Sequence, residues 1–220
     1  LINADGTGEK FLTLYNGENS GPLQRAAITN DEKYCYYVSD NDVWRINLDG
    51  SGKENLTNTP SIKKAFGGIS PDSTYVLFDI AAEPWSIQKL DIKTRKVMPV
   101  LEGEGNTFVI FGVARNKNLI AYVKDSVFLV ANYDGNSISE PKNFVNITRS
   151  TGFVFSPDGN KVYFTPYGSG PDEINTMEMA EKNLVSGKIS KITNFNIEEI
   201  LNYTISRDGN FGAFSISGPC

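Results

Sequence analysis

The chain has 220 residues, of which 40% are hydrophobic and 11% aromatic, so it can bury a sizeable core and is too apolar for a disordered segment. Its 21 lysines and arginines against 26 aspartates and glutamates give a net charge of −5, which argues against a nucleic-acid-binding surface. No residue is a histidine, which excludes Ser-His-Asp and Cys-His catalysis by this chain.

Two cysteines, Cys35 and Cys220, are too far apart to form a metal-binding or redox Cys-x-x-C pair. Cys35 lies among tyrosines on an expected strand, so we expect a buried free thiol. A disulfide between the two cysteines is the alternative, and it requires the last strands of the chain to lie beside those near residue 35. No apolar run approaches the roughly 18 residues that a membrane span needs, so we expect no membrane insertion.

A turn recurs five times along the chain, each time between two short apolar runs. The turns are Thr29-Asn30-Asp31, Ser70-Pro71-Asp72, Ala114-Arg115-Asn116, Ser156-Pro157-Asp158 and Ser206-Arg207-Asp208, so the repeat length is 41 to 50 residues. Proline favours the backbone angles of such turns, and the aspartate accepts hydrogen bonds from the main chain that follows it. The aspartates therefore indicate turns rather than calcium sites.

Each repeat is expected to hold four short antiparallel strands. The first strands cover 25–29, 65–69, 107–113, 151–155 and 200–205, and the second strands cover 34–38, 74–79, 119–123, 161–164 and 211–214. A third strand at 43–48 and a more polar fourth at 53–57 complete the first full repeat. Residues 174–184 have some helix propensity, but the repeat on either side favours a strand and a loop. This order is typical of an all-β propeller with one four-stranded blade per repeat.

We therefore expect a single β-propeller domain over residues 1–220. Four blades are expected at about 21–58, 61–103, 106–147 and 149–195, and a fifth combines 200–220 with 1–14. The last assignment rests on the match of Asn3-Ala4-Asp5-Gly6 to Asn47-Leu48-Asp49-Gly50. Pairing of the two ends would close a five-bladed ring and cover its exposed sheet edges. The alternative is a part of a larger ring of about six or seven blades.

The repeats resemble those of TolB-type propellers, also called PD40 or WD40-like repeats. The resemblance is carried by VWRINLDGSGKENLTNTP at 43–60, by Ser-Pro-Asp at 70–72 and by SPDGNKVYF at 156–164. It implies a binding module of the bacterial cell envelope, periplasmic or secreted. Because the repeats carry no catalytic constellation, we expect a non-enzymatic scaffold that binds another protein or a peptide. Related propellers also serve as gating domains of peptidases, so a peptidase-associated role is an alternative.

Ligand contacts are expected at the face where the first strands begin. The candidates are Arg25, Lys64 and Arg149 on loops that lead into first strands, and Trp85 and Tyr167 on loops between second and third strands. Aromatic and arginine side chains commonly anchor interfaces, and a basic cluster would select anionic groups. Ordinary solvated loop residues are the alternative interpretation. Asp40-Asn41-Asp42 is interpreted as a solvated hairpin tip.

A glycosidase would need two carboxylates about 5–10 Å apart that face the central pocket. The expected first strands carry none, and Glu198 and Glu199 are neighbours whose side chains point to opposite faces of a strand. We therefore expect no enzyme, no cofactor and no metal. Carbohydrate activity or oligosaccharide binding is the second function that the scaffold allows.

Overall fold

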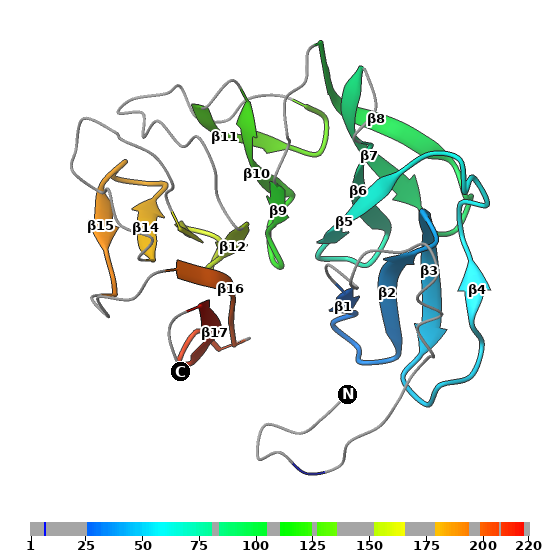
Figure 1. The fold of residues 1–220 in the computed structure, drawn as a ribbon, viewed down its shortest axis with the longest axis horizontal. Coiled ribbons are helices and arrows are strands. Elements are labelled where there is room, and N and C mark those ends of the chain that lie inside the picture. Colours follow the sequence, from blue (N-terminus) through cyan, green and yellow to red (C-terminus); the bar gives the residue numbers. More distant parts are fainter. Residues whose placement is uncertain are drawn as a thin grey trace. The chain divides into compact units, whose positions relative to one another are not determined.

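A computed structural model describes residues 7, 26–80, 84–104, 111–124, 127–135, 152–165, 179–193, 199–206 and 208–217. Every regular element in these ranges is a β-strand, and neighbouring strands pair antiparallel in chain order (Figure 1). The expected all-β class is therefore confirmed. The chain divides into two compact units, Leu1–Pro99 and Val100–Cys220, which are described separately.

The first unit contains two sheets, each built as a four-stranded meander. The first sheet consists of β1 (Ala26–Ile28), β2 (Tyr34–Ser39), β3 (Asp42–Asn47) and β4 (Glu54–Asn55). The second consists of β5 (Lys64–Ile69), β6 (Tyr75–Ile80), β7 (Trp85–Asp91) and β8 (Val97–Gly103), whose last residues continue into the second unit. Both sheets have the four strands that the repeat predicts.

The two faces of β2 pack in different clusters because side chains alternate along a strand. Tyr36 points into a cluster shared with β5 to β7, where Val76, Phe78 and Leu90 are also buried. Cys35 lies on the opposite face, with Tyr37 and Ile46. Cys35 is a buried free cysteine, and burial raises the pKa of its thiol. The expected free thiol is confirmed, whereas Cys220 lies outside the described residues.

A carboxylate joins the two sheets of the first unit. Glu54 on β4 accepts hydrogen bonds from Arg45 on β3 at 2.7 Å and from Arg95 in the β7–β8 turn at 2.5 Å. The guanidinium of Arg45 also lies 4.8 Å from the ring centroid of Tyr34. These side chains are partly exposed, so each ion pair contributes modestly to stability.

The second unit holds the remaining three sheets. They are β9 (Phe111–Val113), β10 (Leu119–Lys124) and β11 (Val127–Asn132); β12 (Phe153–Phe155), β13 (Lys161–Phe164), β14 (Ala180–Asn183) and β15 (Ile189–Lys191); and β16 (Glu199–Ile205) with β17 (Gly212–Ser217). Of the range 174–184, where a strand and a loop are favoured over a helix, β14 confirms the strand at Ala180–Asn183, and 174–178 lie outside the described residues. Residues 1–6 and 8–14, which are expected to complete the fifth blade, lie outside the described residues, so ring closure stays a prediction.

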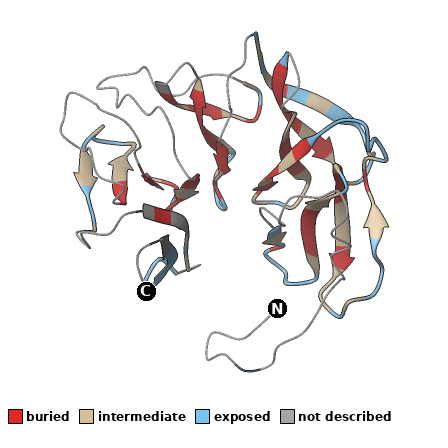
Figure 2. Ribbon diagram, viewed as in Figure 1, coloured by how far each residue is buried: buried red, intermediate tan, exposed pale blue. Residues whose placement is uncertain are grey.

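The core of the second unit is an aromatic cluster between β9–β11 and β12–β15. The ring centroids of Phe128 and Phe153 lie 5.1 Å apart, and those of Phe128 and Phe164 lie 5.8 Å apart. Buried residues accordingly lie along β9, β10 and β12 in this unit (Figure 2). Within the described ranges, no helix has the length and apolar character needed to cross a membrane.

Candidate functional site

Two loops of the first unit are hydrogen-bonded to each other at the end of the sheets where β3 and β5 begin. One is the Asp40-Asn41 turn between β2 and β3, and the other is the loop 58–63 that leads into β5. The side-chain amide of Asn41 donates to the carbonyl of Pro60 at 2.9 Å. We call residues 40–41 and 58–63 together the loop face. It combines a loop between a second and a third strand with a loop that leads into a first strand, the two kinds of loop in which ligand contacts are expected.

The backbone geometry of the turn between β2 and β3 favours Asp and Asn at positions 40 and 41. Both residues have positive φ, 50° and 62°, as a tight hairpin turn requires. Asp and Asn tolerate this conformation better than most other residues because their side chains bond the local main chain. The turn connects the paired residues Ser39 and Asp42. It therefore brings the first residue of β3 directly beneath the loop face.

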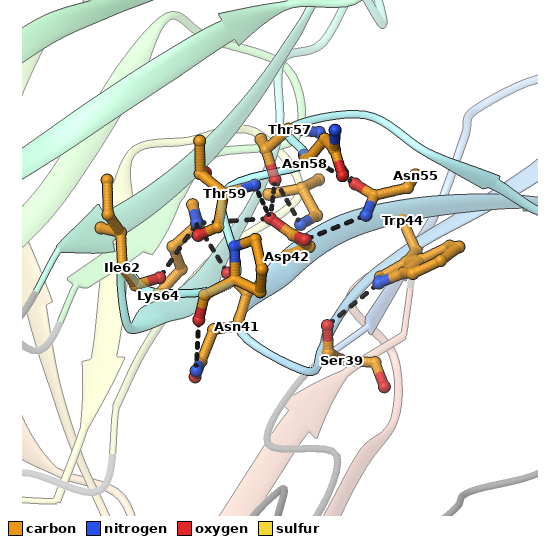
Figure 3. Close-up of polar contacts among 12 residues, drawn as sticks. Ser39, Asn41, Asp42, Trp44, Asn55, Thr57, Asn58, Thr59, Ile62 and Lys64 are labelled. Carbon is orange, nitrogen blue, oxygen red and sulfur yellow. Dashed lines mark hydrogen bonds and ion pairs between the residues drawn. The ribbon is translucent and has the colours of Figure 1, made fainter.

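Asp42 is buried, with a relative exposure of 2%, so its expected place in a solvated hairpin tip is wrong. Its carboxylate accepts hydrogen bonds from the Thr57 hydroxyl at 2.6 Å, the Thr59 N–H at 2.7 Å and the Asn55 amide at 2.9 Å (Figure 3). Burial by itself would raise the pKa of Asp42, but these bonds and the charge of Lys64 outweigh it and lower the pKa. The carboxylate is held in its charged form.

Lys64 lies against this carboxylate from the other side. Its Nζ is 3.5 Å from Asp42 Oδ1, and both side chains are only 3% exposed. The ammonium also donates to the main-chain oxygens of Asn41 at 2.7 Å, Ile62 at 2.9 Å and Thr59 at 3.0 Å (Figure 3). Burial lowers the pKa of Lys64, while the charge of Asp42 acts in the opposite direction. All three ammonium protons therefore have oxygen acceptors inside the protein.

The same ammonium fixes the outer loop. It bonds the carbonyls of Thr59 and Ile62, so the main chain of the loop is held from below. The residues of the loop 58–63 are nevertheless exposed, and Ile62 has a relative exposure of 38%. The main chain of this loop is fixed by a buried side chain, and its own side chains are exposed to solvent. Such a loop is suited to bind a partner because it is already ordered.

The five predicted ligand residues have different outcomes. Lys64 and Trp85 are described, and each is the first residue of a strand rather than part of a loop. Both are buried, with exposures of 7% and 4%, so their expected position on exposed loops is wrong. Lys64 is drawn inward by carbonyl and carboxylate oxygens, and the large ring of Trp85 is removed from water. Arg25, Arg149 and Tyr167 lie outside the described residues.

Sequence reasoning missed the residues that surround Lys64. Asp42, Asn55 and Thr57 are common polar residues near strand ends, and such residues usually indicate turns and solvated loops. Their convergence depends on the pairing of β3 with β4, which aligns Trp44 with Asn55. No local motif marks this arrangement. In the part of the chain that the structure describes, no three His, Cys, Asp or Glu side chains are grouped to hold a metal ion.

Repeated four-stranded antiparallel meanders are typical of the blades of a β-propeller, and comparison with solved structures shows this fold. The fold is similar to TolB from Acinetobacter baumannii, with a TM-score of 0.64 and 11% identity over 88% of this chain and 46% of that one. It is similar to a putative TolB from Agrobacterium tumefaciens, with a TM-score of 0.65 and 17% identity over 88% of this chain and 69% of that one. The TolB-like propeller fold is thereby shown.

An enzyme shares the same fold. An oligogalacturonate lyase in complex with manganese has a TM-score of 0.61 and 14% identity over 87% of this chain and 58% of that one. This chain thus spans about half the length of the A. baumannii TolB structure and less than two thirds of the lyase. No family model and no curated protein matches the sequence. Similarity at these identities concerns the fold, since one propeller scaffold carries many functions.

Proposed function

We propose that this TolB-like propeller is a non-enzymatic scaffold that binds another protein or a peptide through the loop face. The observation that carries the proposal is the loop 58–63, whose main chain is bonded to the buried Lys64 while its side chains are exposed. A preordered loop loses little conformational freedom on binding, so more of the contact energy appears as affinity.

The side chains of the loop face suit a polypeptide partner. Ile62 is an exposed large apolar residue, and the loop face also carries two exposed charged residues, Lys63 beside it in the chain and Asp40 in the β2–β3 turn. Interfaces between proteins commonly combine an apolar contact with a charged and polar surrounding. We propose that the partner is met outside the cytoplasm, in the periplasm or after secretion. The resemblance of the repeats to TolB-type sequences supports this location.

The proposal is tested by partner capture followed by affinity measurement. The purified chain is immobilised and incubated with bacterial envelope extract, and each captured protein is then purified and titrated against the chain. Ile62→Asp is expected to raise the Kd for a specific partner at least about tenfold, as replacement of a central contact does. Val185→Asp is the matched control because Val185 is an exposed apolar residue, at 81%, in the β14–β15 turn. Equal affinity of the two variants for the partner would reject the loop face as the binding surface.

A carbohydrate-active role is the second candidate, and the similarity to the oligogalacturonate lyase is the observation that favours it. The chain is incubated with oligogalacturonates with and without manganese, and the unsaturated product of a lyase is followed by its ultraviolet absorbance. Product formation that increases in proportion to the concentration of the purified chain would replace the scaffold proposal with this one. Unchanged substrate under both conditions would remove the lyase candidate.

A further inference from the structure

Four oxygen atoms surround the Lys64 ammonium. Three are main-chain carbonyl oxygens, of Asn41, Thr59 and Ile62, at 2.7 to 3.0 Å, and the fourth is a carboxylate oxygen of Asp42 at 3.5 Å. They come from the β2–β3 turn, from the loop before β5 and from the first residue of β3 (Figure 3). The only formal charge among these four oxygens is that of one carboxylate, which balances one positive charge.

This set of oxygens favours a monovalent cation over a divalent one. Main-chain carbonyls replace the hydration shell of monovalent cations in selective sites. Calcium instead takes about six to eight oxygen ligands and commonly several carboxylates. Three carbonyls also match the three N–H donors of a primary ammonium group. The chemical class that fits is therefore a primary ammonium ion or another small monovalent cation.

Much of the site is held by contacts that do not involve Lys64. Asp42 is fixed by the donors of Asn55, Thr57 and Thr59. Asn41 is fixed by its turn and by the bond of its amide to the carbonyl of Pro60. Because these contacts do not require the lysine side chain, the oxygens of Asp42 and Asn41 are expected to keep their positions when that side chain is shortened. The Thr59 and Ile62 carbonyls then lose their bonds to the ammonium, so the loop 58–63 is expected to lose order.

We propose that these four oxygens form a monovalent-cation site that Lys64 fills with its own ammonium group. When the side chain is shortened, a free primary ammonium ion takes the same place and restores the order of the loop 58–63. The cation holds the loop, and the aliphatic part of Lys64 serves as its tether. This inference is independent of the proposed partner binding, because it concerns only the free protein.

The test compares wild type with Lys64→Ala in ammonium salts. Thermal unfolding and cleavage of the loop by a nonspecific protease are followed as n-propylammonium chloride is added at constant ionic strength. Lys64→Ala is expected to show a saturable rise in Tm, several-fold larger than that of wild type, together with protection of the loop. Tetramethylammonium, which has no N–H donor, and the Lys64→Ala variant that also carries Asp42→Asn are expected to show neither effect. Equal responses to both salts, or an unchanged response in the double variant, would overturn the proposal.

A second measurement does not depend on the folding of Lys64→Ala. An enclosed ammonium exchanges its protons slowly with water, so wild type is expected to show one sharp lysine ammonium signal in ¹⁵N NMR near neutral pH. The signal is expected to vanish in Lys64→Arg and to persist in Lys63→Arg, which changes an exposed neighbour. Absence of the signal in wild type, or its loss in Lys63→Arg alone, would contradict an enclosed Lys64 cation.

Discussion

The hydroxyl of Ser156 donates to the carboxylate of Asp158 at 2.5 Å and accepts the main-chain N–H of Lys161 at 2.9 Å. The same hydroxyl-to-carboxylate bond occurs at 2.6 Å in three other turns, as Thr29–Asp31, Ser70–Asp72 and Ser206–Asp208. The hydroxyl thus links the turn aspartate to the start of the second strand. This shared contact explains why the turn has a recurrent sequence.

Ser156→Ala is expected to lower the free energy of unfolding by about 1–2 kcal/mol, because it removes a bond to a carboxylate and leaves a strand N–H without its acceptor. Ser156 is itself buried, so water replaces these bonds poorly. Urea denaturation measures the change. Ser61→Ala, at an exposed serine of the loop 58–63, is the control and is expected to have little effect. Equal effects of the two substitutions would contradict this role of the hydroxyl.

Acid is expected to weaken the same turn. The bond from Ser156, followed by that from the Asn160 N–H, lowers the pKa of Asp158 from 3.8 to about 2. Because the folded pKa lies below the unfolded one, the stabilising effect of this carboxylate is complete above about pH 4 and is lost toward about pH 2. Asp158→Asn should therefore lose less stability over this interval than wild type, as measured by urea titration at each pH. Parallel pH profiles would refute the assignment.

The fourth residue of each of four turns has a left-handed backbone. Glu32 and Ser73 have φ of 56° and 57°, whereas glycine occupies the corresponding positions 159 and 209. Ser73→Gly is expected to stabilise the protein by up to about 1 kcal/mol, since glycine adopts positive φ without steric cost. Gly159→Ala should have the opposite effect, because alanine is strained at the φ of 66° that Gly159 adopts. Thermal unfolding measures both, and a shift of the same sign in both variants would disprove the argument.

Gly112 lies where β9 passes close to β12. A Cβ at this position would overlap the main-chain oxygen of Phe153, which cannot move without disturbing its strand. Gly112→Ala is expected to cost more than about 2 kcal/mol, as overpacking of a tight core does. At Gly212 on β17 an added Cβ would make ordinary contacts, the nearest with Ile205 at 3.4 Å. Chemical denaturation should therefore show a larger loss of stability for Gly112→Ala than for Gly212→Ala. Equal stability of the two variants would contradict the close approach of β9 to β12.

Local turn chemistry made most of the strand pattern predictable. β2, β10 and β13 begin at the predicted residue, and β6 and β17 begin one residue later. The turn residues act on their immediate neighbours, so their positions can be inferred without the tertiary structure. The fourth strand of the first blade is an exception. It was expected over 53–57 but covers Glu54–Asn55, because the Thr57 hydroxyl and the Thr59 N–H bond to Asp42 instead of extending the ladder.

The amino-acid sequence by itself determined the all-β class, the repeat length and the turns, since these depend on contacts between residues close in the chain. Only the tertiary structure decided the place of Lys64. The sequence predicts Lys64 to lie on an exposed loop, because an isolated charge is costly to bury. Here three carbonyls and the Asp42 carboxylate, brought together from separate segments, replace the lost water. Whether a charge is buried depends on such long-range partners, which no local pattern of residues reveals.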